Sequence, residues 1–239
     1  MRSTRRWSRS SARGSTPSSA RRRPLAKAAL LDLDGTLVDA NYQHALAWYR
    51  AFRRYDIVVP MWRVHRHIGM GGDQFVTAVA GEDVERRLGD DLRDASGEEF
   101  QKLRDECVPL EGSRELVEEL VARGHAVVLA SSSNEDDLTY FLDQIGVRDL
   151  VQYTTADDVE RSKPHPDIVN AALDKAGTRD AVMVGDSRWD IEAAANAGLE
   201  TVCVITGGWS EQELRDAGAA AVFDSLVALR EGLDATPLG

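Results

Sequence analysis

Short runs of apolar residues recur along the chain, and most are followed by a stretch with helical spacing. The first run, Lys27–Asp34 (KAALLDLD), ends in acids before a glycine, as a buried strand that runs into a turn does. Similar runs are Ala126–Ala130, Val151–Thr154, Ala181–Val184, Thr201–Ile205 and Ala221–Phe223. Helical spacing follows at Asp137–Ile145, Asp167–Ala176 and Ile191–Ala197. The alternation predicts an α/β fold with a parallel sheet, whose ligands bind at the carboxyl ends of the strands.

A long interval separates the first predicted strand from the second. From Ala40 to Val108 the apolar spacing is helical, as in HALAWYRAF and GDQFVTAVA, and no clear strand interrupts it. A segment of that length is too large for an ordinary loop. We therefore expect residues 41–108 to form a small helical domain over the strand ends, inserted in a core made of residues 25–40 and 109–239.

Charge is distributed unevenly along the chain. The formal charge is −11, yet residues 1–23 contain eight arginines and no acid, so the rest is more acidic still. An acidic body does not suit a general nucleic-acid binder. Residues 1–24 have too few apolar side chains to fold, and we expect a disordered basic tail. That tail could be dispensable, act as a targeting segment, or touch nucleic acid without specificity.

The remaining composition indicates a reducing compartment. Cys107 and Cys203 are far apart and lack metal-ligand spacing, which argues against a disulfide framework and a zinc site. No apolar run approaches the roughly 20 residues that a membrane-spanning helix needs. We expect a cytoplasmic protein without a membrane partner, and the composition leaves its oligomeric state open.

Two carboxylates stand at the end of the first predicted strand, in the sequence DLDGT. Asp32 and Asp34 are two positions apart, so both can face one crevice, and Gly35 lets the chain turn sharply. Such a pair suits a metal ion, or a nucleophile beside a group that carries protons. Taken alone, the pattern is equally typical of a solvated turn.

Three further candidate groups fall near the ends of later predicted strands. Ser131 closes AVVLAS with a hydroxyl, Lys163 in SKPHPD carries a positive charge before a helix, and Asp186 in MVGDSRWD offers another carboxylate. Each has an ordinary explanation, respectively a polar loop, a surface charge and a helix N-cap. In this order and at these strand ends, however, they supply the parts that phosphoryl transfer needs.

The four motifs resemble, in the same order, those of the haloacid dehalogenase-like superfamily, over about residues 28–223. The insert resembles the helical cap of its phosphoglycolate phosphatase and β-phosphoglucomutase branch. The resemblance implies a Rossmann-like three-layer α/β/α sandwich with an inserted all-helical cap that closes over a small phosphorylated metabolite. It also implies a phosphoric monoester hydrolase that uses Mg²⁺.

The resemblance further implies a role for each matching residue. Asp32 would attack phosphorus and Asp34 would act as general acid and base, while Ser131 and Lys163 would hold the phosphoryl oxygens. Mg²⁺ would bind Asp32, the main-chain carbonyl of Asp34, and Asp186. The residues expected near the substrate or behind these groups are Gly35, Thr36, His44, Gly71, Ser132, Asn134 and Asp190.

Several departures bear on the choice within the superfamily. Asp34 argues against a dehalogenase, which lacks the second aspartate. His44 lies where a phosphoglucomutase has a histidine, but it could equally be a partly buried helix residue. Gly185 replaces the glutamate of the mutase pattern. Hydrolysis is therefore preferred to mutase-like phosphoryl transfer, and a catalytically silent interaction protein with the same fold is the second alternative.

The sequence does not identify the substrate, and phosphoglycolate, a sugar phosphate, a nucleotide and pyrophosphate all stay open. We expect the loop Gly69–Asp73 to determine it, because its glycines permit a close approach of the backbone to a ligand. This loop lacks a basic residue that could bind a second phosphate. The residues before it, Arg63, His65, Arg66 and His67, could meet a carboxylate or phosphate, although a short basic helix is more typically a solvated face.

Overall fold

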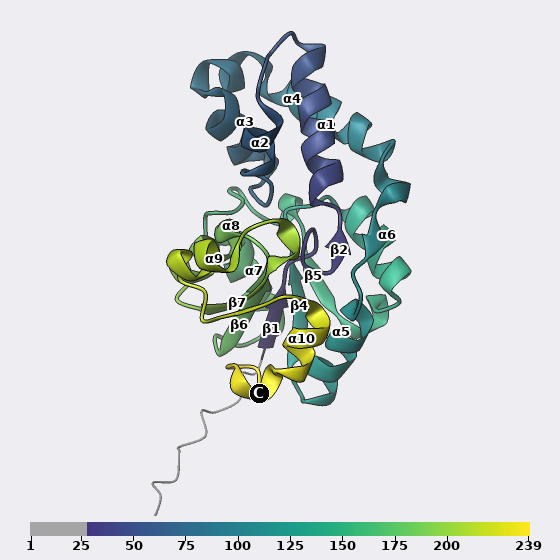
Figure 1. Ribbon diagram of the computed structural model, residues 1–239, viewed down its shortest axis with the longest axis vertical. Coiled ribbons are helices and arrows are strands. Elements are labelled where there is room, and N and C mark those ends of the chain that lie inside the picture. Colours follow the sequence, from purple (N-terminus) through teal and green to yellow (C-terminus); the bar gives the residue numbers. More distant parts are fainter. Residues whose placement is uncertain (1–27) are drawn as a thin grey trace, which may run out of the picture.

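The computed structural model describes residues 28–239 and shows a parallel sheet between helices, with a further group of helices beyond one end (Figure 1). The predictions for residues 1–24 lie outside the described residues. Six strands form the sheet in the order β5-β4-β1-β6-β7-β8, and each pairs in parallel with its neighbours. They are β1 (Ala28–Leu31), β4 (Ala126–Ala130), β5 (Gln152–Thr154), β6 (Ala181–Gly185), β7 (Glu200–Val204) and β8 (Ala221–Phe223).

Both faces of the sheet are covered, which explains why its central strands are continuous apolar runs. Along β1, Ala29 and Leu31 pack into one core cluster, while Ala28 and Leu30 pack into the other. The first cluster is closed by α5 (Ser113–Ala122), α6 (Glu135–Ile145) and α10 (Leu226–Glu231). The second is closed by α7 (Asp167–Ala176) and α8 (Arg188–Asn196), and α9 (Glu211–Ala217) packs beside α8. The predicted α/β sandwich with a parallel sheet is confirmed.

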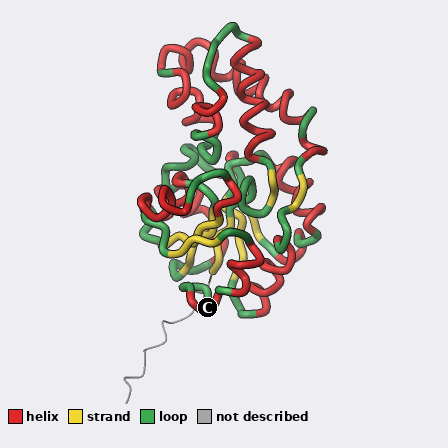
Figure 2. Tube along the Cα trace, viewed as in Figure 1, coloured by secondary structure: helices red, strands yellow, loops and turns green. Residues whose placement is uncertain are grey.

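Four helices within residues 41–101 lie beyond the carboxyl ends of the strands (Figures 1 and 2). They are α1 (Asn41–Arg54), α2 (Met61–His65), α3 (Gly72–Ala80) and α4 (Glu82–Gln101), and together they are called the helical insert below. The insert has an apolar cluster of its own, in which Phe52 and Phe75 are fully buried. Within residues 28–239, no helix is both long and apolar enough to cross a bilayer.

A pair of two-residue strands joins the helical insert to the core. β2 (Val38–Asp39) pairs antiparallel with β3 (Val108–Pro109). The sequence pattern does not predict this pairing, and it assigns Val108 to the helical stretch, whereas in the structure Val108 pairs with Asp39. Two residues are too few to produce a recognisable alternation of apolar and polar positions. Both connections of the insert therefore lie side by side.

Candidate active site

The ends of β1, β4 and β6 meet below the helical insert and bring the predicted residues together. A cavity of about 580 Å³ lies there, and both the core and the insert line it. Its lining includes Asp32 and Asp34 beyond β1, Ser132 beyond β4, and Lys163 from the segment before α7. Residues that are more than a hundred positions apart in the sequence therefore share one site.

Lys163 is the buried cation of this site. Its ammonium donates to Asp32 Oδ1 at 2.6 Å and to Asp190 Oδ1 at 2.7 Å, and the residue is 1% exposed. Burial alone would lower the pKa of Lys163, but the adjacent carboxylates of Asp190 and Asp32 outweigh burial and hold it above its usual range. Lys163 therefore stays charged, and its interpretation as a surface lysine is wrong.

Asp32 has an unusual acidity for an aspartate. Burial raises the pKa of its carboxyl to about 7, against the opposing charge of Lys163, and the nearby charge of Asp190 raises it further. Its Oδ1 accepts from Lys163, whereas no residue within 28–239 donates a hydrogen bond to Oδ2. That second oxygen keeps its lone pairs at the edge of the cavity.

Asp186, directly after β6, is held by two side chains from the other end of the site. Thr36 Oγ1 donates to its Oδ1 at 3.1 Å, and Asn41 Nδ2 donates to its Oδ2 at 2.9 Å. Burial, followed by the charges of Asp190 and Asp32, raises the pKa of Asp186 well above its usual value. The N-cap of α8 is Ser187 rather than Asp186, so the helix-cap explanation of Asp186 is wrong.

The carboxylates fit a hard divalent cation. One oxygen each from Asp32, Asp186 and Asp190 lie within 4.8 Å of one another, and all three residues are buried. Lys163 is the only cation that makes an ion pair with any of the three within the described residues. Burial is the main cause of the raised pKa values of Asp32 and Asp186, and the neighbouring carboxylates raise them further. Oxygen ligands with excess negative charge are the donors that Mg²⁺ prefers.

Asp190 is already engaged on both oxygens. Oδ1 accepts from Lys163, and Oδ2 accepts from the main-chain N–H of Ser187 at 3.1 Å and from its hydroxyl at 2.6 Å. Ser187 and Asp190 together form the capping box of α8. This arrangement supports the expectation that Asp190 orients its neighbours.

Asp34 lies between two partners, one from the core and one from the helical insert. Ser133 Oγ donates to its Oδ2 at 2.6 Å, and His44 Nε2 lies 3.3 Å from Oδ1, an ion-pair distance without a well-directed hydrogen bond. Burial alone would raise the pKa of Asp34, but the charge of His44 and the contacts with both partners hold it below its usual range. His44 also stacks on Phe100, with ring centroids 3.8 Å apart.

The serines after β4 divide into a buried and a cavity-lining group. Ser131 is 1% exposed, and its Oγ accepts from the main-chain N–H of Ser133 at 3.1 Å. Ser132 and Asn134 line the cavity. Asn134 also caps α6, since its Oδ1 accepts from the N–H of Asp137 at 2.9 Å. Ser131 does not line the cavity and its hydroxyl supports the loop, so its expected contact with phosphoryl oxygens stays a prediction.

The loop Gly69–Asp73 meets the core segment that carries Lys163. Asp73 Oδ2 accepts from the N–H of Ser162 at 3.1 Å, and the N–H of Gly71 donates to the carbonyl of Lys163 at 3.4 Å. A Cβ at Gly71 would lie 2.0 Å from Ser162 Cβ, so only glycine fits. Gly71 thus permits contact between insert and core, while Gly69 and Gly72 of the same loop line the cavity, where the sequence led us to expect an approach to a ligand.

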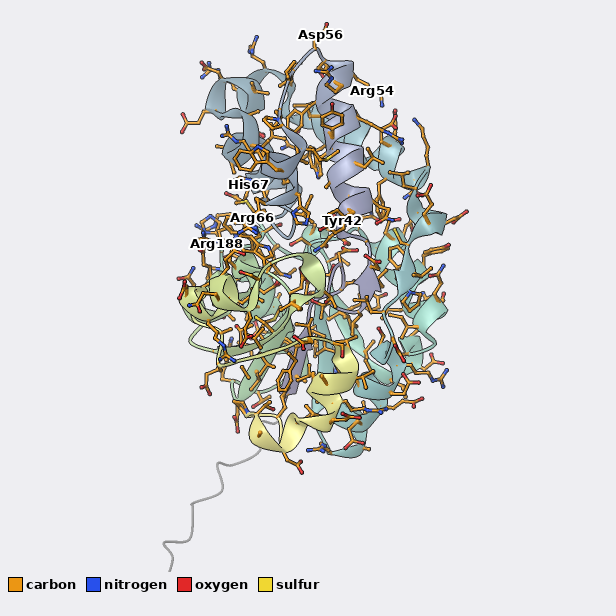
Figure 3. The ribbon with its side chains drawn as sticks, viewed as in Figure 1. Tyr42, Arg54, Asp56, Arg66, His67 and Arg188 are labelled. Carbon is orange, nitrogen blue, oxygen red and sulfur yellow. The ribbon has the colours of Figure 1, made fainter. Side chains whose placement is uncertain are left out.

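The basic residues before this loop do not line the cavity. The guanidinium of Arg66 lies 3.3 Å from the ring centroid of Trp209 and pairs with Glu213 at 2.6 Å. His67 stacks on Trp189 with centroids 5.8 Å apart. Figure 3 shows Arg66, His67 and Arg188 gathered where α2 faces α8. Arg66 and His67 therefore form a second contact between insert and core, and Arg66 is neither part of a solvated face nor an anion site.

Sequence reasoning missed three residues of this site. Asn41 and Ser133 hold the carboxylates of Asp186 and Asp34, and Gly207 leaves room for Asp186, since a Cβ there would lie 1.6 Å from its Oδ2. Asn41 resembles a helix-start residue, and Ser133 is one of three consecutive serines, so neither position stands out. The glycine pair after β7 is the one signal that could have been used.

Comparison with known proteins shows which family the chain belongs to. Residues 29–204 match the model of the haloacid dehalogenase-like hydrolases. The chain is 30% identical over 192 residues to the pyrophosphatase PpaX of Bacillus velezensis, which covers 74% of this chain and 82% of that protein. It is 26% identical over 216 residues to the validoxylamine A 7'-phosphate phosphatase of Streptomyces hygroscopicus subsp. limoneus, covering 84% and 92%. The crystal structure of a hydrolase from Pseudomonas syringae has a TM-score of 0.83 and 31% identity, covering 87% of this chain and 98% of that one.

Proposed function

The chain belongs to the haloacid dehalogenase-like hydrolases, and on that premise we propose that it is a magnesium-dependent phosphatase that hydrolyses a small organic phosphate monoester through a phosphoaspartate. Phosphatase activity as such agrees with its relatives, of which one is named a validoxylamine A 7'-phosphate phosphatase and another a pyrophosphatase. The metal, the intermediate and the roles of single residues are the proposal. One observation carries it, namely the buried Lys163–Asp32 ion pair at 2.6 Å beside Asp186.

In the first step Oδ2 of Asp32 attacks phosphorus and the bond from phosphorus to the alcohol oxygen breaks. Lys163 keeps the other oxygen of Asp32 in place and lends positive charge to a site that a dianionic ester must enter. Mg²⁺, when held by Asp32, the carbonyl of Asp34 and Asp186, would supply the further positive charge that offsets repulsion between carboxylate and phosphate. Thr36 and Asn41 keep the Asp186 carboxylate facing this point.

The alcohol oxygen that leaves needs a proton, and Asp34 is the group proposed to donate it. The low pKa of Asp34 keeps this carboxylate deprotonated in the resting site, so we infer that it takes up a proton when the dianionic ester binds beside it. Transfer of this proton from Asp34 to the leaving oxygen completes the first step. In the second step Asp34 accepts a proton from the water that attacks the phosphoaspartate, which releases phosphate and restores Asp32.

Hydrolysis is favoured over mutase-like transfer by the environment of Gly185. A Cβ at this position would lie 2.5 Å from the Cβ of Asp190, so the glutamate of the mutase pattern could not be accommodated without displacing Asp190. The helical insert covers the cavity and is proposed to act as the cap domain, with residues 41–108 as its extent. The substrate is a small phosphorylated metabolite in a cytoplasmic setting.

The test is turnover of nitrophenyl phosphate by the full chain with Mg²⁺ and after chelation. Activity that is lost on chelation and restored by Mg²⁺ is expected, with wild-type protein trapping labelled phosphate on Asp32. Full turnover in excess chelator, with bound metal excluded by elemental analysis, would contradict the metal assignment. An absence of turnover for every phosphate ester tried would favour the silent interaction protein.

A further inference from the structure

The lining of the cavity contains more acidic than basic groups. Four acids line it without an ion-pair partner among residues 28–239. Asp73 and Asp94 come from the helical insert, while Asp157 and Glu160 come from the core segment between β5 and Lys163. A fifth lining acid, Asp137, is compensated by Arg104 at 3.2 Å. The four uncompensated acids, called the rim acids below, belong to both sides of the cavity.

The cations of the lining are already occupied. Besides His44, the described lining contains only Lys163, which bonds Asp32 and Asp190, and Arg93. Arg93 Nη2 donates to Glu85 at 2.8 Å and to Asp90 at 2.9 Å.

The other terminal nitrogen of Arg93, Nη1, donates to the carbonyl of Gly72 at 3.1 Å and to Glu85 at 3.1 Å. This guanidinium therefore supports the loop Gly69–Asp73 and offers no free donor pair to an anion. The rim acids lie outside the predicted metal ligands, so a bound Mg²⁺ and the phosphate it compensates would leave them unpaired.

Several other residues of the lining are apolar or uncharged. Trp48, Ile68 and Phe100 contribute rings and methyl groups, and Ser96 and Ser162 contribute hydroxyls. Apolar surface with a few hydroxyls and an excess of negative charge suits a polyol or an amine, and it repels a second carboxylate or phosphate. The volume of about 580 Å³ leaves room for a group larger than the phosphate itself.

Resting on the proposed phosphatase function, we propose that the alcohol released from the ester is an uncharged or amine-bearing polyol of sugar size. Esters that carry a second anionic group are then poor substrates. The proposal separates this chain from enzymes for phosphoglycolate and pyrophosphate, whose leaving groups are anionic. Specificity would come from repulsion of the wrong ligand as well as from attraction of the right one.

The test uses three six-carbon esters that are phosphorylated at carbon 6 and differ in the charge of the leaving group. They are glucosamine 6-phosphate, glucose 6-phosphate and 6-phosphogluconate, assayed with Mg²⁺ and the full chain. The ratio of kcat/KM between glucosamine 6-phosphate and 6-phosphogluconate is expected to be about tenfold or more and to shrink as NaCl rises from about 50 to about 500 mM. A smaller ratio, or one that is independent of salt, overturns the proposal.

The double variant Asp157→Asn/Glu160→Gln tests whether the rim acids cause the preference. Its ratio should fall by about threefold or more, since two of four acids are removed. The matched control Glu111→Gln/Asp224→Asn removes two exposed acids that do not line the cavity, and its ratio should stay at the wild-type value. Each ratio compares kcat/KM for two substrates of the same protein. A loss of activity that affects both substrates equally therefore leaves the ratio unchanged. Equal ratios in the two variants overturn the proposal.

A binding measurement separates this proposal from the phosphatase function. Calorimetry on the Asp32→Asn protein with the same three esters should give the same order of Kd. If that order is found while no ester is hydrolysed by the wild type, the proposed function fails and the inference on charge stands. If the wild type hydrolyses nitrophenyl phosphate but binds all three sugar esters equally, the inference alone fails.

Discussion

The pKa values of Asp32 and Asp34, which are two positions apart, are shifted in opposite directions because the partners of the two carboxylates differ. Burial acts on both in the same sense. At Asp32 burial prevails over Lys163 and raises the pKa to about 7, whereas at Asp34 the contacts with His44 and Ser133 prevail and lower it. The two carboxylates therefore titrate in different pH ranges, and their separate proposed roles, Asp32 as nucleophile and Asp34 as carrier of protons, are what the next two predictions test.

The substitutions Asp32→Asn and Asp34→Asn should fail differently. The first removes the nucleophile, so no labelled phosphate should be trapped on the protein. The second weakens proton transfer, so the single-turnover rate should fall by about 10²–10⁴ for an alkyl ester and much less for nitrophenyl phosphate, which needs little protonation. Trapping at the wild-type level in Asp32→Asn, or equal losses for both esters in Asp34→Asn, would refute these roles.

His44→Gln should move the alkaline limb of the pH profile of kcat/KM to higher pH, because Asp34 must carry a proton to act as the acid of the first step. The substitution removes the charge that lowers the pKa of Asp34, so the effect of burial prevails. We also expect about a tenfold loss in kcat for an alkyl ester. Phe100→Leu is the control, since it removes the ring that stacks on His44 but leaves its charge. A limb that shifts equally in both variants would count against a role for His44 in the acidity of Asp34.

At the scale of single residues, the sequence identified the groups whose chemistry is distinctive and missed those that only support them. Lys163 and Asp186 follow from their types and positions, and the structure brings both to Asp32. Asn41 and Ser133 are common polar residues whose partners lie far away in the chain, so only the fold reveals their use. Arg66 was unpredictable for the same reason, because Trp209 and Glu213 come from a distant segment.

At the scale of elements, the buried strands were predictable and their short companions were not. A parallel strand with helices on both faces must be apolar throughout, which leaves a continuous run such as Ala126–Ala130. β2 and β3 have two residues each, and their pairing depends on the insert returning to its starting point. The contact between the loop Gly69–Asp73 and Ser162 likewise depends on how the insert sits on the core.

That contact gives a prediction from two neighbouring glycines. In Gly71→Ala the new methyl group would lie 2.0 Å from Ser162 Cβ, so loop and core must separate, and we expect kcat/KM to fall about tenfold with little change in Tm. In Gly72→Ala the new methyl group would meet the flexible Arg93 side chain at 3.4 Å, and activity should be kept. Activity measured beside thermal unfolding decides the matter. Equal activity in the two variants would show that the contact is dispensable.

At the scale of the whole molecule, the buried acids couple stability to pH and metal. Metal-free folded protein keeps the proton on Asp32 up to a pKa of about 7, whereas the unfolded chain loses it near the ordinary value of 3.8. Between these values the folded state binds more protons, so this carboxyl makes the metal-free protein less stable as pH rises from about 4 to about 7. Mg²⁺ must displace such protons before it can bind.

The stabilisation by Mg²⁺ should therefore grow with pH. At a Mg²⁺ concentration about a hundredfold above the Kd measured at pH 8, we expect a rise in Tm of about 5–10 °C at pH 8. At the same Mg²⁺ concentration we expect almost no rise at pH 5. Thermal unfolding at several pH values, with and without Mg²⁺, measures this. Asp186→Asn is the control, in which the rise should disappear at every pH. A rise of the same size at pH 5 and pH 8 would contradict displacement of protons from these carboxylates.

The paired strands β2 and β3 also have a consequence for how the chain folds. β1 pairs with β4 although the whole insert separates them in the sequence, and Ala28 lies beside Ala126. Closing a loop of that length costs conformational entropy. The insert has an apolar cluster of its own, so it can condense early, and its β2–β3 pairing then holds the two ends of the loop together. If the insert folds first, the long connection becomes a short one before the central sheet assembles. A late-folding insert would leave β1 exposed as an unpaired edge, and such edges are where aggregation begins.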